Sequence, residues 1–292
     1  MVAPSQRDVA IPVNKGCIRG SAWLPPTKPY PLVLLAPGGN GRRGSNGKSR
    51  VFDHIAALLA ENGIGAFIFN ARGQGIAKFE DDDGVHNEHS DGKFTILNFV
   101  EDIRSIIDAV ARGSIEAFAG CGASRFGLFG QCGGGIACLK AAVGNARVAS
   151  VATFGACPDY KKFYDQEWIR EEVRRQRTGS EKAVDIDFDE EFRLRRTGEY
   201  EMAAALPHIT QPVLIMNGTN DVLEHYCYRF MDEMSKTVRW LGFAGKSVRV
   251  AFVLLKGAKH SPPPREPETG ASRNFYSLVL SWFQDTLSDA DG

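Results

Sequence analysis

The stretch FGLFGQCGGG, residues 126–135, decides the fold. Its first four residues are typical of an apolar strand, and the small residues at its end are typical of a helix packed closely against that strand. The Gly-x-Cys-x-Gly turn between them holds Cys132 in strained backbone, and glycines flank the cysteine because strand and helix approach each other there. Such a turn lifts its central side chain clear of a sheet. The pattern predicts Cys132 as a nucleophile at a helix N-terminus, where the helix dipole favours a thiolate.

Apolar runs of strand length alternate with amphipathic stretches along most of the chain. The predicted strands are residues 17–24, 32–36, 66–70, 126–129, 150–154, 213–217 and 248–255. The predicted helices are residues 51–61, 94–112, 134–143, 225–241 and 273–287. This alternation predicts an α/β fold, a mostly parallel twisted sheet covered by helices on both faces. The first strands, near residues 9 and 17, are too close together for a crossover helix, so they predict an antiparallel start.

A nucleophile of this kind needs a general base, and two polar residues follow predicted strands. His260 comes directly after the last predicted strand, and Asp221 comes just after the strand before it. The carboxyl ends of parallel strands share one edge of a sheet, where reacting groups are usually placed. The chain order of nucleophile, acid and histidine therefore predicts a Cys132–His260–Asp221 triad. Asp159 is the alternative acid, and a structural cysteine in an ordinary strand–helix turn is the alternative to the whole triad.

These motifs resemble those of the α/β-hydrolase superfamily over roughly residues 32–287. The segment GQCGG at 130–134 is most similar to the cysteine elbow of dienelactone hydrolases, whereas serine is usual in the wider superfamily. The segment NARGQG at 70–75 resembles the Asp-x-Arg-Gly-x-Gly loop of many hydrolases. The resemblance implies the α/β-hydrolase fold, the triad and no cofactor. The loop PGGNG at 37–41, where dienelactone hydrolases generally carry a glutamate, and a long insertion later in the chain both argue against carrying over the dienelactone substrate.

The resemblance also implies an oxyanion hole made of two backbone N–H groups. These map to Gly133, directly after the nucleophile, and to Gly39 in the loop after the strand at 32–36, with Asn40 as its neighbouring candidate. We expect Asn40 and Arg72 to contact substrate.

Residues 158–207 interrupt the alternation of strands and helices. Charges crowd this segment, as in REEVRRQR at 170–177, and aromatic residues are interspersed among them. We expect a small helical cap at 158–207, inserted into a core domain of residues 1–157 and 208–292, with a plain surface insertion as the alternative. In a cap, Phe163 and Trp168 would line a pocket for a medium-sized, largely apolar substrate.

Composition and charge exclude several other classes of protein. Lys and Arg number 35, as do Asp and Glu, so the basic excess of a nucleic-acid binder is missing. No apolar run reaches the roughly 18 residues that a membrane span needs, and the start of the chain lacks a secretory-signal pattern, which favours a cytoplasmic protein. The six cysteines form no C-x-x-C pair and show no metal-ligand spacing, so we predict no metal site. Neither a complete P-loop nor a Gly-x-Gly-x-x-Gly helix start is present.

The sequence therefore predicts an acyl-transfer enzyme that hydrolyses an ester, lactone or thioester through Cys132 without a cofactor. One alternative is an acyltransferase or cyclase, which passes the acyl group to a nucleophile other than water. The other is a non-catalytic ligand-binding protein on the same scaffold, which would not need the triad. The expected partners are a small-molecule acyl substrate and, as one option, a second copy of the chain.

Overall fold

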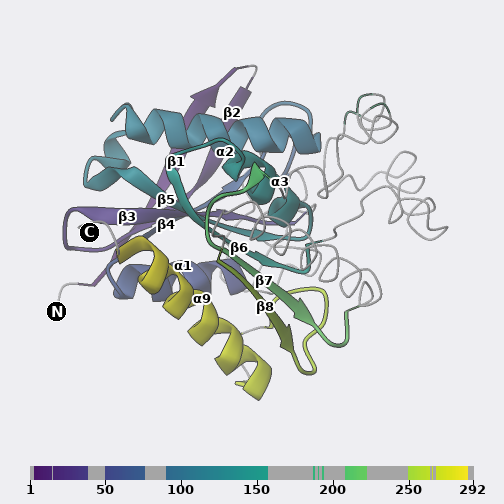
Figure 1. The fold of residues 1–292 in the computed structure, drawn as a ribbon. Coiled ribbons are helices and arrows are strands. Elements are labelled where there is room, and N and C mark those ends of the chain that lie inside the picture. Colours follow the sequence, from purple (N-terminus) through teal and green to yellow (C-terminus); the bar gives the residue numbers. More distant parts are fainter. Residues whose placement is uncertain are drawn as a thin grey trace.

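An eight-stranded sheet forms the centre of the molecule (Figure 1). The computed structural model describes residues 3–14, 16–38, 50–75, 90–156, 208–221, 249–263 and 268–288, together with residues 187, 190, 193 and 265. The strands are β1 (Ser5–Val13), β2 (Gly16–Leu24), β3 (Tyr30–Ala36), β4 (Gly65–Asn70), β5 (Cys121–Gln131), β6 (Val148–Phe154), β7 (Val213–Gly218) and β8 (Val250–Leu255). Their order across the sheet is β1-β2-β4-β3-β5-β6-β7-β8.

The sheet is mostly parallel, and its antiparallel part lies at one end. β2 pairs antiparallel with both β1 and β4, whereas every other neighbouring pair is parallel. The fold class predicted from the sequence, including the antiparallel start, is therefore confirmed. Since β3 to β8 run in one direction, their carboxyl ends share one edge of the sheet.

Helices cover both faces of the sheet, as Figure 1 shows. α1 (Val51–Glu61) and α9 (Gly270–Ser288) pack on one face, and α2 (Ile96–Ala111) and α3 (Gly133–Ala142) pack on the other. A short 3₁₀ turn, Glu116–Phe118, precedes β5. The α-helices α1, α2, α3 and α9 begin and end within a few residues of the bounds predicted from the sequence. The helix predicted at 225–241 lies outside the described residues.

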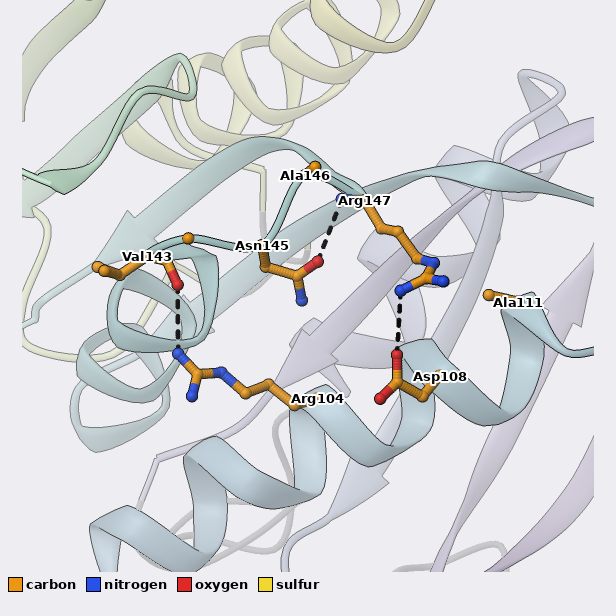
Figure 2. Close-up of a pocket in the computed structure, with 8 residues that line it drawn as sticks. Arg104, Asp108, Ala111, Val143, Asn145, Ala146 and Arg147 are labelled. Carbon is orange, nitrogen blue, oxygen red and sulfur yellow. Dashed lines mark hydrogen bonds and ion pairs between the residues drawn. The ribbon is translucent and has the colours of Figure 1, made fainter.

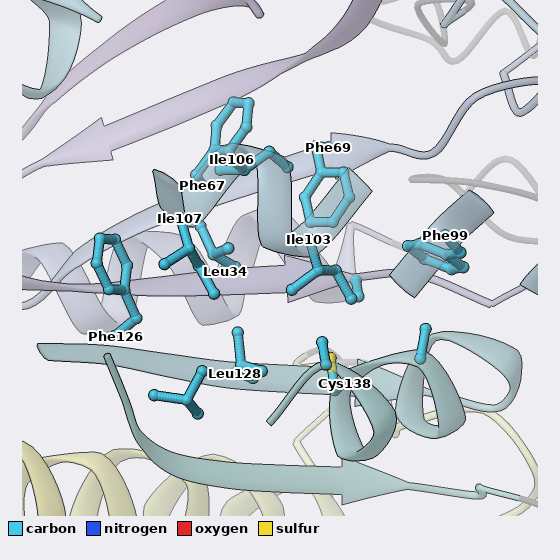
Figure 3. Close-up of a cluster of buried hydrophobic side chains, with 14 of the residues drawn as sticks. Leu34, Phe67, Phe69, Phe99, Ile103, Ile106, Ile107, Phe126, Leu128 and Cys138 are labelled. Carbon is cyan, nitrogen blue, oxygen red and sulfur yellow. The ribbon is translucent and has the colours of Figure 1, made fainter. Parts of the chain in front are cut away.

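Alternate side chains of the central strands fill two separate apolar layers. On β3, Leu32 and Leu34 face the layer under α2 and α3, while Val33 and Leu35 face the layer under α1 and α9. Figure 3 shows the first layer, in which Ile103 and other side chains of α2 pack above the sheet. Full burial of such a side chain contributes about 1.5–3 kcal/mol to folding. Burial on both faces explains why these strands read as continuous apolar runs rather than alternating ones.

A buried ion pair fixes the loop that follows β4. Arg72 Nε donates to one carboxylate oxygen of Asp102 at 2.5 Å, and the Arg72 backbone N–H donates to the other at 2.8 Å. The Arg72 side chain is 7% exposed and that of Asp102 is fully buried. Burial raises the pKa of Asp102 to about 6, and the hydrogen bonds and charge of Arg72 oppose this rise. Because desolvation offsets much of the attraction in such a pair, its main effect is to fix the position of the loop.

Most of the segment at 158–207 lies outside the described residues, which include only Asp187, Glu190 and Arg193 from it. The helical cap, the alternative acid Asp159 and the pocket residues Phe163 and Trp168 therefore remain predictions. In the part of the chain that is described, no helix is both long enough and apolar enough to cross a membrane.

Candidate active site

Cys132 occupies a sharp turn between β5 and α3. Its φ of 50° and ψ of −120° make it the one residue other than glycine with a positive φ in the described part of the chain. Backbone strain of this kind costs about 1–3 kcal/mol and is concentrated at functional sites. A Cβ atom on Gly130 would collide with the carbonyl of Gly134, and one on Gly134 would collide with the carbonyl of Ala36. The strained backbone and the close approach predicted for this turn are both present.

Asp221 and His260 reach the same edge of the sheet from the loops after β7 and β8. The His260 Nδ1 atom lies 3.1 Å from each carboxylate oxygen of Asp221. The Asp221 side chain is fully buried, whereas that of His260 is 29% exposed. A buried carboxylate on Nδ1 holds the imidazole in one orientation and leaves the other ring nitrogen for Cys132.

Two hydrogen bonds hold the loops of Asp221 and His260 together. The Gly257 N–H donates to Thr219 Oγ1 at 2.8 Å, and the Asn220 N–H donates to the carbonyl of Ala258 at 2.9 Å. Each contact joins a residue near Asp221 to one near His260. The separation of the two side chains is therefore set by the backbone and not by the side chains alone.

Cys132 and His260 shift each other's pKa in opposite directions. Burial would raise the pKa of the Cys132 thiol, but the charge of His260, a hydrogen bond between the two side chains and the Gly133 N–H together lower it. Burial likewise disfavours the charged form of His260, but the negative charge of Cys132 and the hydrogen bond to Asp221 raise the pKa of His260 above its ordinary value. A lower pKa for the thiol and a higher one for the imidazole favour a thiolate–imidazolium pair.

We expect iodoacetamide at pH 7 to alkylate Cys132 before Cys121 or Cys138. The thiolate is the reacting form, and burial raises the pKa of Cys121 to about 12 and raises that of Cys138 as well, so both remain thiols. The labelling rate of Cys132 should fall only as the pH drops through its lowered pKa. Peptide mapping after limiting alkylation measures the order.

His260→Ala provides the control for this order. Without the imidazolium the pKa of Cys132 rises, and each unit of rise lowers the thiolate fraction about tenfold below that pKa. Labelling at pH 6 should therefore slow strongly in this variant. Labelling of Cys121 or Cys138 before Cys132 in the unmodified protein would contradict the thiolate–imidazolium pair of Cys132 and His260.

Of the two residues predicted for the oxyanion hole, the structure describes Gly133 but not Gly39. Gly133 is the first residue of α3, and its N–H points to the Cys132 sulfur closely enough to lower the pKa of the thiol. Gly39 and Asn40 lie outside the described residues and remain predictions. The loop after β3 is described as far as Gly38, where a Cβ atom would lie 3.4 Å from the Cβ of Cys132. Gly38 therefore lies directly beside Cys132.

Arg72 does not have the role expected from the sequence. Besides its pair with Asp102, it donates to the carbonyls of Asn14 and Asn98 at 3.0 and 3.2 Å and to Glu101 at 3.1 Å. Its guanidinium is buried and engaged on all sides by protein acceptors. Arg72 therefore holds the loop after β4 and is not placed to contact substrate.

Gln131, which precedes Cys132, and Gln74, which contacts Gly38, were not identified from the sequence. Gln131 Nε2 donates to Ser261 Oγ at 3.4 Å, which links the end of β5 to the loop of His260. Gln74 Nε2 donates to the carbonyl of Gly38 at 3.0 Å. Gln74 lies in the NARGQG segment, but only the fold shows which backbone its side chain reaches.

A cavity of about 940 Å³ lies away from these residues, between α2 and the loop from α3 to β6 (Figure 2). There Arg104 donates to the carbonyls of Lys140 and Val143 at the end of α3, and Arg147 pairs with Asp108 at 3.3 Å. The cavity is at the amino end of β6, whereas Cys132 follows the carboxyl end of β5. Its charged groups hold secondary-structure elements together, so we do not assign the reaction to it. Within the described ranges, no cluster of three or more His, Cys, Asp or Glu side chains is arranged to hold a metal ion.

Solved structures with the α/β-hydrolase fold resemble this chain over almost its whole length. A dienelactone hydrolase from Anabaena variabilis is 18% identical with a TM-score of 0.60, covering 98% of this chain and 99% of that one. The thermostable carboxylesterase EstE1, cloned from a metagenomic library, is 19% identical with a TM-score of 0.67, covering 97% and 89% of the two chains. An esterase from Pyrococcus furiosus is 14% identical with a TM-score of 0.63, covering 97% and 93%.

No protein-family model matches the sequence, and a search of curated proteins finds no match. At the identities of the solved structures, the likeness establishes the α/β-hydrolase fold of this chain and nothing finer.

Proposed function

We propose that this α/β-hydrolase-fold protein is an acyl-transfer enzyme that hydrolyses a carboxylic ester, lactone or thioester with Cys132 as its nucleophile. The observation that carries the proposal is the pairing of a strained, partly exposed cysteine with a histidine whose Nδ1 lies 3.1 Å from a buried aspartate. A structural cysteine or a ligand-binding scaffold would need neither the backbone strain nor the oriented histidine.

In the acylation half-reaction, the Cys132 thiolate attacks the carbonyl carbon of the substrate. A carbon–sulfur bond forms while the carbonyl π electrons move to oxygen, giving a tetrahedral oxyanion that the Gly133 N–H stabilises. The oxyanion collapses, the bond to the leaving group breaks, and the imidazolium of His260 protonates the departing oxygen or sulfur. The products of this half-reaction are a thioester on Cys132 and a neutral imidazole.

In the deacylation half-reaction, His260 takes a proton from water while the water oxygen attacks the thioester carbon. The second oxyanion collapses, the carbon–sulfur bond breaks, and the thiolate–imidazolium pair is restored with release of the carboxylic acid. Asp221 stabilises the imidazolium each time it forms.

Hydrolysis of a series of p-nitrophenyl esters with acyl chains of increasing length tests the proposal. We expect turnover by the unmodified protein and none above background by Cys132→Ala. Cys17→Ala is the matched control, since Cys17 is also partly exposed but lies on β2, and it should retain full activity. An added amine or thiol acceptor distinguishes hydrolysis from acyl transfer by the product formed. Undiminished turnover by Cys132→Ala would reject the proposal.

A further inference from the structure

Gly155, the residue directly after β6, lies next to the imidazole of His260. Its φ of 59° falls in the left-handed region, which glycine enters without strain. A Cβ atom on Gly155 would lie 2.7 Å from the carbonyl oxygen of His260, and 3.3 and 3.4 Å from Nδ1 and Cε1 of its ring. Nonbonded carbon atoms are most stable about 3.5–4.0 Å apart, so a side chain at residue 155 would collide with the His260 backbone and crowd the ring.

The peptide group between Phe154 and Gly155 is hydrogen-bonded on both sides. Its carbonyl, that of Phe154, accepts from the Cys132 N–H at 3.0 Å. Its N–H, that of Gly155, donates at 3.0 Å to the carbonyl of Met216 on β7, the strand that leads to Asp221. Because a peptide group is planar, these two bonds together fix its orientation. The end of β6 is therefore tied to the elements that carry the nucleophile and the acid.

An added side chain at residue 155 would displace His260 and not the end of β6. β6 is an inner strand, paired with β5 on one side and β7 on the other. His260 lies in the loop after β8, which is the last strand of the sheet, and its side chain is partly exposed. The imidazole would thus move away from the place where its Nδ1 meets both carboxylate oxygens of Asp221.

We propose that Gly155 is a positioning residue for His260, an inference that rests on the proposed function, in which His260 is the general base. Gly155 has no side chain and takes no part in the reaction. It keeps free the space in which the imidazole lies within reach of both Cys132 and Asp221. A side chain at residue 155 should weaken the contact of His260 with Cys132, and the pKa of the thiol, which His260 lowers, should then rise.

The test measures iodoacetamide alkylation of Cys132 against pH in Gly155→Ala. Alkylation reports the thiolate and requires no substrate. Each unit by which the pKa of the thiol rises lowers the thiolate fraction about tenfold at low pH. We expect the midpoint of the profile to rise by about one pH unit or more, so that alkylation below both midpoints slows at least about tenfold. Acylation by p-nitrophenyl acetate should slow in the same variant.

Gly144, which precedes β6, provides the matched control. Its φ of 68° is close to that of Gly155, but a Cβ atom there would have no atom of another described residue within 4 Å, apart from its chain neighbours. Gly144→Ala therefore adds similar backbone strain without the contact with His260, and it should leave the pH profile and the acylation rate unchanged. Gly155→Asn and Gly144→Asn form a second pair, because asparagine adopts a positive φ more readily than alanine does.

A double variant shows whether the effect of Gly155→Ala passes through His260. His260→Ala removes the imidazole and should by itself raise the midpoint of the alkylation profile. Adding Gly155→Ala to His260→Ala should cause no further rise, because two changes that act through one contact are not additive. A glycine that is needed only for the stability of the loop would not show this dependence on His260.

Four results would overturn the inference about Gly155. These are an unshifted profile in both Gly155 variants, an equal shift in the Gly144 variants, a further shift in the double variant, and loss of the fold in both Gly155 variants. The last would mean that the glycine is required for folding and not for the placement of one side chain. Failure of the unmodified protein to be acylated, with the alkylation profiles still as expected, would instead reject the proposed function.

Discussion

Replacing Asp221 by asparagine should lower kcat by at least about 100-fold while leaving the fold intact. Asp221 accepts from His260 Nδ1 through both of its oxygens, so its negative charge orients the imidazole and stabilises the imidazolium. An asparagine amide can offer N–H in place of oxygen to Nδ1 and so favour the wrong tautomer. Neutralising the acid of a serine-protease triad costs roughly 10⁴ in kcat. We expect a smaller loss of kcat here, because a thiolate is already deprotonated, whereas a serine hydroxyl must transfer its proton to the base during the attack.

Steady-state kinetics with circular dichroism of the purified variant measures this effect. Asp159→Asn is the control, because Asp159 is the alternative acid suggested by the sequence, and it should change kcat by less than about threefold. The opposite ranking of the two variants would transfer the acid to Asp159. Small and equal effects would indicate a cysteine–histidine dyad that works without a carboxylate.

Replacing Asp102 by alanine should lower the free energy of unfolding by about 3–5 kcal/mol. The change leaves the Arg72 guanidinium charged and buried without the carboxylate that accepts from both its Nε and its backbone N–H. Removing the buried partner of a buried charge is strongly destabilising, and the remaining carboxylate partner of Arg72, Glu101, is largely exposed. Urea denaturation followed by tryptophan fluorescence measures the loss.

Glu101 provides the comparison for Asp102, since it pairs with the same guanidinium but its side chain is 67% exposed. Exposed pairs contribute about 0–1 kcal/mol, so Glu101→Gln should have little effect on unfolding. Replacing both members of the buried pair, in Arg72→Met with Asp102→Leu, should cost less than Asp102→Ala alone. A loss below about 1 kcal/mol for Asp102→Ala would contradict the role assigned to the pair.

The sequence indicates Cys132, His260 and Asp221 as a candidate triad because each of them follows shortly after an apolar strand. Short apolar runs identify parallel strands, and the carboxyl ends of such strands share an edge, so residues far apart in the chain can be placed together without knowledge of any contact. The glycines on both sides of Cys132 are a further local signal. A Cβ atom on Gly130 would meet the backbone of Gly134, and one on Gly134 would meet the backbone of Ala36, so both positions require glycine. The prediction placed His260 and Asp221 at the same edge, and their atoms lie 3.1 Å apart.

Contacts between loops could not be predicted in this way. Arg72 was expected to contact substrate, but its buried partner Asp102 is 30 residues away on α2 and no periodicity links the two. The link from Gln74 to Gly38 spans 36 residues and depends on the position of β4 next to β3. Such contacts follow from the packing of the whole sheet. A single sequence identifies the elements that pack, but not which loop side chains meet once they do.

The acyl-enzyme itself tests the central claim most directly. The protein is mixed with an excess of a p-nitrophenyl ester, quenched in acid during turnover, and examined by intact mass spectrometry and peptide mapping. We expect a mass increase equal to the acyl group in place of one thiol hydrogen, on the peptide that contains Cys132. The adduct should be removed by neutral hydroxylamine, as thioesters are, and should be absent from Cys132→Ala. Turnover without an adduct on Cys132, or an adduct on another residue, would contradict the account.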